Sequence, residues 1–323
     1  MFKHRQSKLL YPAVLSLLLV ALGCGKASSG TTTTGHPPAT VAAAGTFPVT
    51  VRAANGSVRI AARPTSIVCL SPTATEMLYA IGAGPQVKAV DKYSDYPKGV
   101  PTTNLDGLDP NVESIAAYDP DLVIVSNDTS SLNSQLKALG IPVVYEPAAA
   151  DLAQEYAEFV SLGQATGHVS QATAEVAKLK GQIAAIVGGV AKPARPATYY
   201  YELDQTYYSE TSSTFIGQVL GLLGLRSIAD TAKGAASSGG YPQLSAEFIL
   251  KANPDYVFLA DTVCCQQSPA TVAARPGWSV LSAVKDHRVL GLNDDIASRW
   301  GPRIVVLIGE VADFIKAHPV AGS

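Results

Sequence analysis

The sequence feature that most constrains the fold is an internal repeat. The segment Glu113-Ser-Ile-Ala-Ala-Tyr-Asp-Pro-Asp-Leu-Val-Ile-Val125 recurs as Glu247-Phe-Ile-Leu-Lys-Ala-Asn-Pro-Asp-Tyr-Val-Phe-Leu259. Each copy predicts a short helix that begins near its glutamate, then a Pro-Asp turn, then an apolar strand buried on both faces as in a parallel sheet. A chain that contains this unit twice is expected to fold as two similar lobes.

Further strands and helices alternate around both copies of the repeat. The expected strands cover residues 67–70, 87–90, 141–145, 198–203 and 289–292, and the expected helices cover residues 75–81, 131–139, 215–223 and 302–317. This alternation predicts an α/β protein of two Rossmann-like three-layer lobes with parallel sheets. Ligands of such sheets bind at the carboxyl ends of the strands, so a ligand cleft is expected between the lobes.

A proline-free stretch at residues 169–187 lies between the two predicted lobes. Its apolar residues fall on one helical stripe, namely Ala172, Val176, Leu179, Ile183 and Ile186. Such a helix would span roughly 28 Å and join the lobes as one rod. A surface helix within one lobe is the alternative. The expected boundaries are 46–167 for the N-terminal lobe, 168–190 for the linking helix and 191–323 for the C-terminal lobe.

The N-terminus has the pattern of a secretion signal. Basic residues at positions 3, 5 and 8 precede a charge-free run from Leu9 to Gly23, which is shorter than the ~20 residues of a spanning helix. The run ends in Ala21-Leu22-Gly23-Cys24 and resembles a bacterial lipobox, which implies a signal peptide at 1–23 and a lipid on Cys24. An ordinary cleaved signal and an uncleaved anchor are the alternatives. All three readings place the remaining chain outside the cytoplasm.

Residues 24–45 are expected to form a flexible tether, because Gly, Ser, Thr, Ala and Pro dominate them and leave little to bury. Lys and Arg number 24 against 26 Asp and Glu, and no basic cluster follows the signal, so nucleic acid is not an expected partner. The five histidines stand at positions 4, 36, 168, 287 and 318 and do not converge on strand ends, so no metal site is expected.

No catalytic motif is recognisable in the sequence. It contains no Gly-x-Ser-x-Gly elbow, no P-loop, and no Gly-x-Gly-x-x-Gly after a strand, so the chain is not expected to be an enzyme. A structural or adhesive lipoprotein is the remaining alternative class. Beyond Cys24 the cysteines are Cys69, Cys264 and Cys265. A disulfide between the adjacent pair, a disulfide of one of them with Cys69, free thiols and metal ligation are all open at this point.

Several segments together resemble one family. They are Arg63-Pro-Thr-Ser-Ile-Val-Cys-Leu-Ser-Pro-Thr-Ala-Thr-Glu76, Tyr93-Ser-Asp-Tyr-Pro97, both repeats, Tyr241-Pro-Gln-Leu-Ser245 and Arg299-Trp-Gly-Pro-Arg303. The chain resembles the periplasmic binding proteins of the cobalamin and ferric-siderophore type, in which one long helix joins two lobes. The resemblance implies a monomeric substrate-binding protein that has no cofactor of its own and delivers a metal chelate to the permease dimer of an ABC importer.

Within this family, the segment Tyr93 to Pro97 and the order of Tyr208, Tyr241, Asp295 and Arg299 are similar to the cobalamin-binding members. The resemblance implies that Tyr93, Tyr208, Tyr241, Asp295 and Arg299 bind the ligand, and that this ligand is a corrinoid. Leu105, Ser126 and Tyr241 stand where those members have tryptophan. A ferric siderophore or haem is the alternative cargo, and a surface ion pair is the alternative role of Asp295 and Arg299.

The resemblance also implies a docking role for Glu113 and Glu247, one on each lobe. Each carboxylate is expected to meet an arginine of the permease dimer, and a repeated unit presents matching charges to a symmetric partner. The alternative is local, because an acidic residue in the first turn of a helix gains ~0.3–1 kcal/mol from the helix dipole without any partner.

Overall fold

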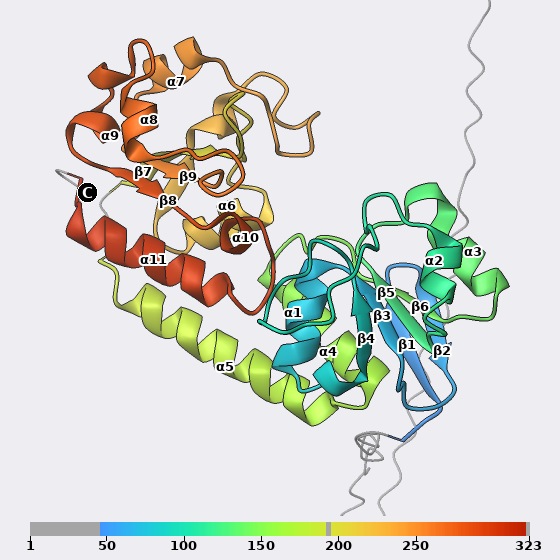
Figure 1. Cartoon of the computed structure of the whole chain (residues 1–323). Helices are drawn as coiled ribbons and strands as arrows, with labels where there is room; N and C mark the ends of the chain where they lie inside the picture. The colour runs from blue at the N-terminus through green and yellow to red at the C-terminus, as the bar shows by residue number, and fades with distance from the viewer. Residues whose placement is uncertain (1–45, 192–194, 321–323) are drawn as a thin grey trace, which may run out of the picture. The chain divides into compact units, whose positions relative to one another are not determined.

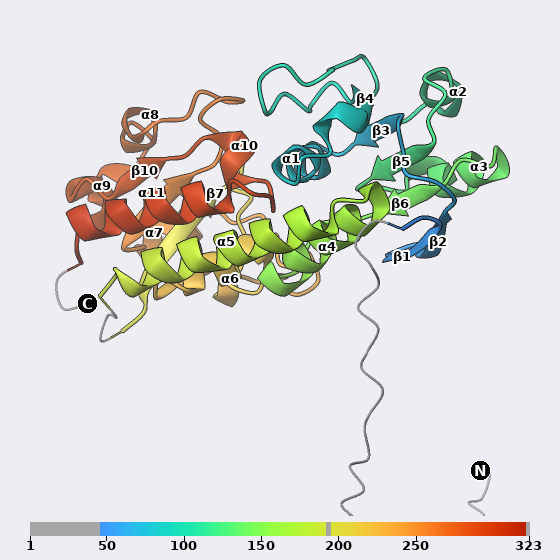
Figure 2. The same cartoon turned by 90° about the horizontal axis from the view of Figure 1, so that it is seen from below.

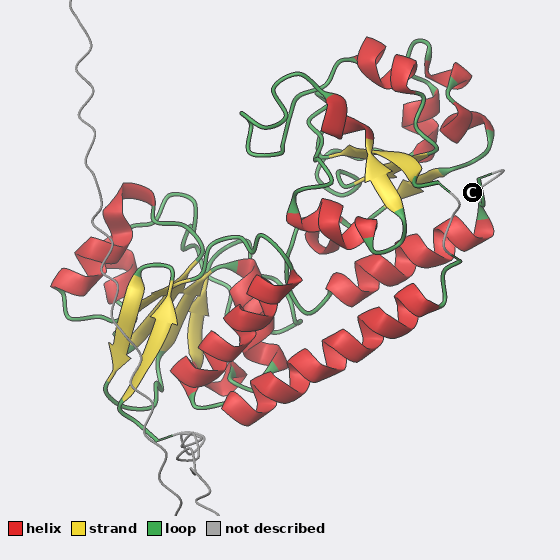
Figure 3. Ribbon diagram, turned by 180° about the vertical axis from the view of Figure 1, so that it is seen from behind, coloured by secondary structure: helices red, strands yellow, loops and turns green. Residues whose placement is uncertain are grey.

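Two four-stranded parallel sheets, one in each lobe, organise the chain (Figure 1, Figure 3). The computed structural model describes residues 46–191 and 195–320. The sheet of the first lobe has the order β4-β3-β5-β6 and that of the second β10-β9-β7-β8, and both are parallel throughout. The predicted α/β fold with two lobes is therefore confirmed.

The strands of the first sheet are β3 (Ile67–Leu70), β4 (Val87–Val90), β5 (Leu122–Val125) and β6 (Val143–Tyr145). Those of the second sheet are β7 (Ala197–Glu202), β8 (Leu225–Ser227), β9 (Tyr256–Leu259) and β10 (Val289–Gly291). A separate antiparallel hairpin consists of β1 (Val49–Ala53) and β2 (Gly56–Ile60). All residues of β3, β5 and β9 are buried, as expected for strands covered on both faces.

Helices surround both sheets. In the first lobe they are α1 (Pro72–Ala80), α2 (Val112–Ala116), α3 (Leu132–Ala138) and α4 (Leu152–Thr166). In the second lobe they are α6 (Phe215–Gly221), α7 (Ala246–Ala252), α8 (Pro269–Ala273), α9 (Ser282–Lys285), α10 (Asp294–Ala297) and α11 (Ile304–Ala317). α5 (Val169–Gly188) lies between the two sets along the chain.

Each lobe has three layers because successive strand residues face opposite sides of the sheet. In the first lobe, Ile67, Cys69 and Ile124 pack in one apolar cluster with residues of α1, α4 and α5. Val68 and Val123 pack in a second cluster with residues of α2 and α3. The second lobe repeats this arrangement, with α6 and α11 against one face of its sheet and α7, α8 and α9 against the other.

The helix α5 contributes to the cores of both lobes. Its first half places Ala172, Val176 and Leu179 in a first-lobe cluster, whereas Ile183 belongs to a second-lobe cluster. The last turns pack beside α11, and the two helices lie side by side in both Figure 1 and Figure 2. One amphipathic stripe is therefore shared between two cores, which resists rotation of one lobe against the other.

The Pro-Asp turn of the repeat has the same structural role in both lobes. The carboxylate of Asp121 accepts hydrogen bonds from the backbone N–H and the hydroxyl of Thr65 at 2.8 and 3.1 Å. The carboxylate of Asp255 accepts from the N–H and hydroxyl of Thr198 at 2.8 and 3.0 Å. Asp121, just before β5, thus fixes the start of the neighbouring strand β3, and Asp255, just before β9, fixes the start of β7. The repeated sequence therefore forms the same contact in both lobes.

Several elements were not foreseen from the sequence, namely β1, β2, β8, α4, α8, α9 and α10. The predicted signal peptide, the tether and Cys24 lie outside the described residues. Within the described part of the chain, no helix combines the length and the apolarity that crossing a membrane requires.

Candidate functional site

Segments that follow the carboxyl ends of strands in the two lobes meet at Arg299. Its guanidinium donates to the carboxylate of Glu76 at 2.9 Å and to the backbone oxygen of Tyr93 at 3.2 Å, both in the first lobe. Within its own lobe it donates to Asp295 at 2.5 Å. Glu76 lies on α1 after β3, Tyr93 follows β4, and Arg299 follows β10 and α10. The strand ends of both lobes therefore face one junction, as expected for a ligand site in this fold class.

Glu76 is the centre of this junction. Its side chain is only 1% exposed and accepts from Arg299 and also from Arg303, whose Nε and Nη2 lie 2.8 and 2.6 Å from the two carboxylate oxygens. One buried anion thus faces two guanidinium groups from the other lobe, and hydrogen bonds between charged groups are the strong ones. Binding to Glu76 raises the pKa of Arg303, although burial acts in the opposite direction.

The loop from Tyr93 to Pro97 forms the first-lobe wall of the junction. Tyr93 and Tyr96 remain 41% and 45% exposed, which is high for aromatic side chains of this size. The ammonium of Lys92 lies 4.9 Å from the ring centre of Tyr93, and the guanidinium of Arg303 lies 4.3 Å from that of Tyr96. Cations over the ring faces hold both aromatics in place without burying them.

A second pair of predicted ligand residues meets in the second lobe. Tyr208 and Tyr241 are 41% and 45% exposed and stand on adjacent segments, since Tyr208 pairs with Gln243 and the N–H of Ser209 donates to Pro242 at 3.0 Å. Burial raises the pKa of the Tyr241 phenol, so that side chain stays neutral and able to donate a hydrogen bond. Each of the two side chains combines a flat apolar face with a polar hydroxyl.

The predicted ligand residues form two groups. Tyr93, Asp295 and Arg299 are in contact, and Tyr208 lies beside Tyr241. No hydrogen bond, ion pair or ring contact joins the two groups among residues 46–191 and 195–320. The sequence reasoning did not assign Glu76 and Arg303 to the site. A signal was present, because Glu76 is the one charged residue of α1 and Arg303 stands four residues after Arg299.

Buried charges also support the strand ends of the second lobe. Glu202, at the end of β7, accepts both guanidinium branches of Arg275 at 2.5 and 2.6 Å. Arg275 in turn lies 4.7 Å from the ring centre of Trp278. Asp261 is fully buried beside Glu202, and burial, followed by the charge of Glu202, raises its pKa to about 7. Burial and the neighbouring charge thus favour the neutral form of Asp261, which limits the repulsion between the two acids.

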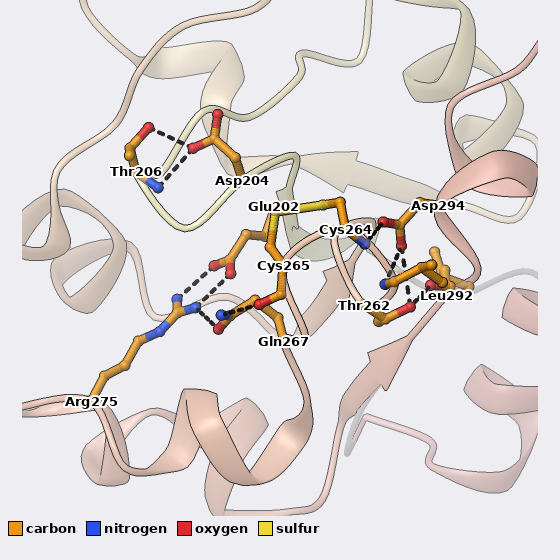
Figure 4. Close-up of a disulfide and its surroundings, with 11 residues drawn as sticks. Glu202, Asp204, Thr206, Thr262, Cys264, Cys265, Gln267, Arg275, Leu292 and Asp294 are labelled. Carbon is orange, nitrogen blue, oxygen red and sulfur yellow. Dashed lines mark hydrogen bonds and ion pairs between the residues drawn. A yellow bond between two sulfur atoms is a disulfide. The ribbon is translucent and has the colours of Figure 1, made fainter. Parts of the chain in front are cut away.

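The structure contains a disulfide between the adjacent Cys264 and Cys265, on the loop that follows β9 (Figure 4). Cys69 is a free, buried thiol within β3, where its sulfur donates to the backbone oxygen of Ser71. Burial raises the pKa of Cys69 to about 12, which keeps it protonated and unreactive. Of the pairings left open by the sequence, the structure therefore has the vicinal one.

Three buried glutamates lie on the first-lobe side near the second lobe. Burial raises the pKa of Glu146, Glu158 and Glu155 to about 7, 8 and 9. Glu158 accepts from the indole N–H of Trp300 at 3.1 Å, a further bond between the lobes. Neither carboxyl oxygen of Glu155 has a hydrogen-bond partner in the described chain. Burial thus favours the neutral form of these three acids.

The two predicted docking residues occupy matching places. Glu113 stands in the first turn of α2 and Glu247 in the first turn of α7, and both are exposed. Each helix begins with a side-chain cap, from Asn111 and from Ser245. In Figure 1 both helices lie on the side turned away from α5. A backbone hydrogen bond, followed by one from the side chain of Ser245, lowers the pKa of Glu247, so its carboxylate is ionised at neutral pH.

A hollow of about 330 Å³ lies at the opposite end of the second sheet. Its lining includes Ala197, Leu225 and Tyr256, which are the first residues of β7, β8 and β9. Amino ends of parallel strands are not where ligands of this fold class bind, and few polar groups converge there. We therefore assign no cargo to this hollow and retain the junction at Arg299 as the candidate site.

Comparison with known proteins identifies the family. The model of the family described as periplasmic binding protein matches residues 67–296, which covers most of the chain. The chain therefore belongs to the periplasmic binding protein family, whose members are substrate-binding proteins of transporters, and it is not an enzyme.

Individual relatives agree with this assignment. An uncharacterized ABC transporter substrate-binding lipoprotein of Bacillus subtilis is 29% identical over 95% of this chain and 96% of its own length. The cobalamin-binding protein of Halobacterium salinarum is 29% identical over 92% and 83% of the two chains. Among solved structures, a possible iron-binding periplasmic solute-binding protein of Staphylococcus epidermidis matches with a TM-score of 0.68 and 28% identity, over 78% of this chain and 99% of that one.

Proposed function

We propose that this member of the periplasmic binding protein family captures a corrinoid at the junction of its lobes and delivers it to the permease of an ABC importer. The observation that carries the proposal is that both lobes have exposed tyrosine side chains on the segments that follow the carboxyl ends of their strands. Tyr93 contacts Arg299 through its backbone oxygen and Tyr96 lies against Arg303. Tyr208 and Tyr241 stand on adjacent segments of the second lobe. Flat apolar faces with hydroxyl tips suit a large planar macrocycle edged by amides.

The charges of the site favour a cargo with polar neutral edges. Arg299 already has three acidic neighbours, Glu76, Asp295 and Asp95 at 2.9, 2.5 and 3.5 Å, so its positive charge is compensated before any cargo arrives. Its remaining role toward a cargo is to donate a hydrogen bond rather than to neutralise an anion. Amide carbonyls at the edge of a corrinoid accept such bonds without adding charge.

Delivery is proposed to proceed through Glu113 and Glu247. Both are exposed, both stand at the same place of the repeated unit, and neither forms an ion pair within the described part of the chain. A carboxylate without an internal cation is available to an arginine of another protein. The lipid on Cys24 is proposed to hold the protein at the outer face of the membrane that contains the importer.

Calorimetric titration of the full-length protein with cyanocobalamin tests the cargo. The alternative cargo, haem or a ferric siderophore, is favoured by the similarity to the possible iron-binding protein and is tested in parallel with haemin and a ferric trihydroxamate. Saturable heat with cyanocobalamin alone is the expected result. Binding of one of the iron chelates in its place would refute the corrinoid assignment.

Docking is tested by transport into vesicles that contain the purified permease and ATPase. The double variant Glu113→Gln and Glu247→Gln is expected to retain cargo affinity and to lose most of its stimulation of transport. Glu310→Gln, which removes an exposed carboxylate from α11, is the matched control and should behave as the wild type. Undiminished transport by the double variant would exclude the docking role.

A further inference from the structure

The disulfide between Cys264 and Cys265 is not expected to stabilise the fold as a whole. The stabilisation that a disulfide provides grows with the length of chain that it closes, and these two residues are neighbours, so no residue lies between them. It also ties no other element to the loop, because both sulfurs belong to the same turn. What the bond fixes is the local shape of one surface loop.

That loop is held on one side by Asp294, at the start of α10. The two carboxylate oxygens accept from consecutive backbone amides, the N–H of Val263 at 2.9 Å and that of Cys264 at 2.7 Å. The hydroxyl of Thr262 donates to the same side chain at 3.2 Å and to the backbone oxygen of Leu292 at 2.6 Å. Figure 4 shows these bonds converging on Asp294.

The other side of the loop is held by the buried ion pair of the second lobe. The amide of Gln267 donates to the backbone oxygen of Cys265 at 3.1 Å, and its side-chain oxygen accepts from Arg275 at 2.7 Å. Arg275 is itself fixed by Glu202. Hydrogen bonds to Asp294 on one side and to Gln267 on the other thus hold the loop in place. Cys264 and Val263 nevertheless remain exposed, Val263 to 66%.

The position of the loop connects the two groups of proposed cargo residues. Asp294 is followed by Asp295, which binds Arg299, while Glu202 ends the strand that leads to Tyr208. In the sheet, β9 lies between β10 and β7, so the loop of the disulfide follows the strand between the one that leads to Arg299 and the one that leads to Tyr208. The exposed surface of Val263, Cys264 and Cys265 is fixed before any cargo binds. A contact made there would therefore cost little ordering of the protein.

We infer that the Cys264–Cys265 disulfide and Val263 form an apolar rim of the cargo site, which packs against the face of a conjugated macrocycle. This inference rests on the proposed function and adds a contact to it. Divalent sulfur is polarisable and packs favourably against π systems, and the ring closed by adjacent cysteines keeps both sulfurs in a fixed orientation. The rim would select a flat apolar cargo over a compact hydrophilic one.

Binding measurements on matched variants test the rim. The double variant Cys264→Ser and Cys265→Ser, and separately Val263→Ser, are expected to weaken cyanocobalamin binding by about 2- to 10-fold. Val280→Ser is the control. Val280 is 60% exposed in the same lobe and stands two residues before Ser282, which bonds Asn253 ahead of the amino end of β9. This control should leave the affinity unchanged.

Chemical protection provides a second readout that needs no substitution. In the wild-type protein, reduction of the disulfide by dithiothreitol is followed by mass spectrometry with and without saturating cyanocobalamin. The thiolate of the reagent must reach a sulfur in line, so a cargo packed on the rim should slow reduction about 10-fold or more. Unchanged reduction in the presence of bound cargo would overturn the inference even if the serine double variant failed to fold.

The outcomes separate the inference from the proposed function. If the wild type binds cyanocobalamin while both rim variants bind equally well and reduction is unprotected, the rim assignment is wrong and the proposed function stands. If haemin binds in its place, the same variants and the protection assay test the rim with haemin. If only the ferric trihydroxamate binds, the rim assignment is wrong, because that chelate has no conjugated macrocycle. If none of the three probes binds, the proposed function is refuted and the rim assignment with it.

Discussion

Replacement of Glu76 by glutamine should weaken the bond between the two lobes. The substitution preserves the size of the side chain and removes its charge, so the effect reports electrostatics rather than packing. Glu76 accepts one bond from Arg299 and two from Arg303, at 2.9, 2.8 and 2.6 Å. All three partners are shielded, with side-chain exposures of 1%, 13% and 17% for Glu76, Arg299 and Arg303.

The expected magnitude follows from what remains after the charge is removed. Removing one partner of a buried ion pair lowers the free energy of unfolding by ~3–5 kcal/mol, because the other charge stays buried without a partner. Arg299 keeps its bond to Asp295, and both guanidinium groups retain some contact with water, so we expect the lower end, about 3 kcal/mol. For a chain of this size that corresponds to a decrease of about 6 °C in the unfolding midpoint.

Thermal unfolding followed by circular dichroism measures this change. Because Glu76 belongs to the first lobe and both arginines to the second, the variant should also show a broader transition in which the lobes unfold less cooperatively. Glu175→Gln is the control, since it breaks the ion pair with Lys178, whose side chain is 59% exposed, and should cost at most ~1 kcal/mol. An unfolding midpoint for Glu76→Gln within 1 °C of the wild type would show that the junction contributes no net stability.

Three further predictions concern stability. Burial raises the pKa of Glu155 to about 9 from 4.5, so the folded state keeps a proton that the unfolded chain loses, and stability should fall as the pH rises from about 5 to 9. Glu155→Gln should flatten that decline, as measured by urea unfolding across this range. Gly181→Ala in α5 should stabilise by ~0.5–1 kcal/mol, since nothing lies within 4 Å of the new Cβ, whereas Gly163→Ala in α4 should destabilise, because its Cβ would meet Ala172 at 2.6 Å. Asp255→Asn should cost ~1–3 kcal/mol in the same assay, because the start of β7 loses its charged acceptor.

Much of the architecture was predictable from local sequence. The strands at residues 67–70 and 87–90 were expected with the bounds that β3 and β4 have in the structure. β3 is a continuous apolar run, and β4 departs from one only at the exposed Lys88, so both segments have ends that are clear in the sequence. The predicted helix at residues 169–187 corresponds to α5 for the same reason, since its apolar stripe is long and regular.

The hairpin of β1 and β2 and the helix α4, which were not foreseen, also had local signals. The hairpin of β1 and β2 turns at Asn55-Gly56, a pair typical of tight turns between strands. The helix α4 is capped by Asp151 at its start and ends at Gly167, which has the left-handed conformation that favours glycine. These signals are short, and they become persuasive only when the neighbouring elements are known.

The sequence by itself determined that this chain folds as two related α/β lobes, because a duplicated unit with buried strands has no other way to cover its apolar faces. It also placed Glu113 and Glu247 at equivalent positions, since the repeat fixes their register. Only the tertiary structure decided which charges meet. Glu76 and Arg299 are separated by 223 residues, and no local pattern relates them until the carboxyl ends of strands from both lobes are brought to one junction. The cysteines follow the same rule, because Cys69 is enclosed within a central strand and only Cys264 and Cys265 can reach each other. Periodicity and composition determine secondary structure, because they concern residues that are close along the chain. Buried ion pairs join distant residues and therefore depend on how whole helices and strands pack.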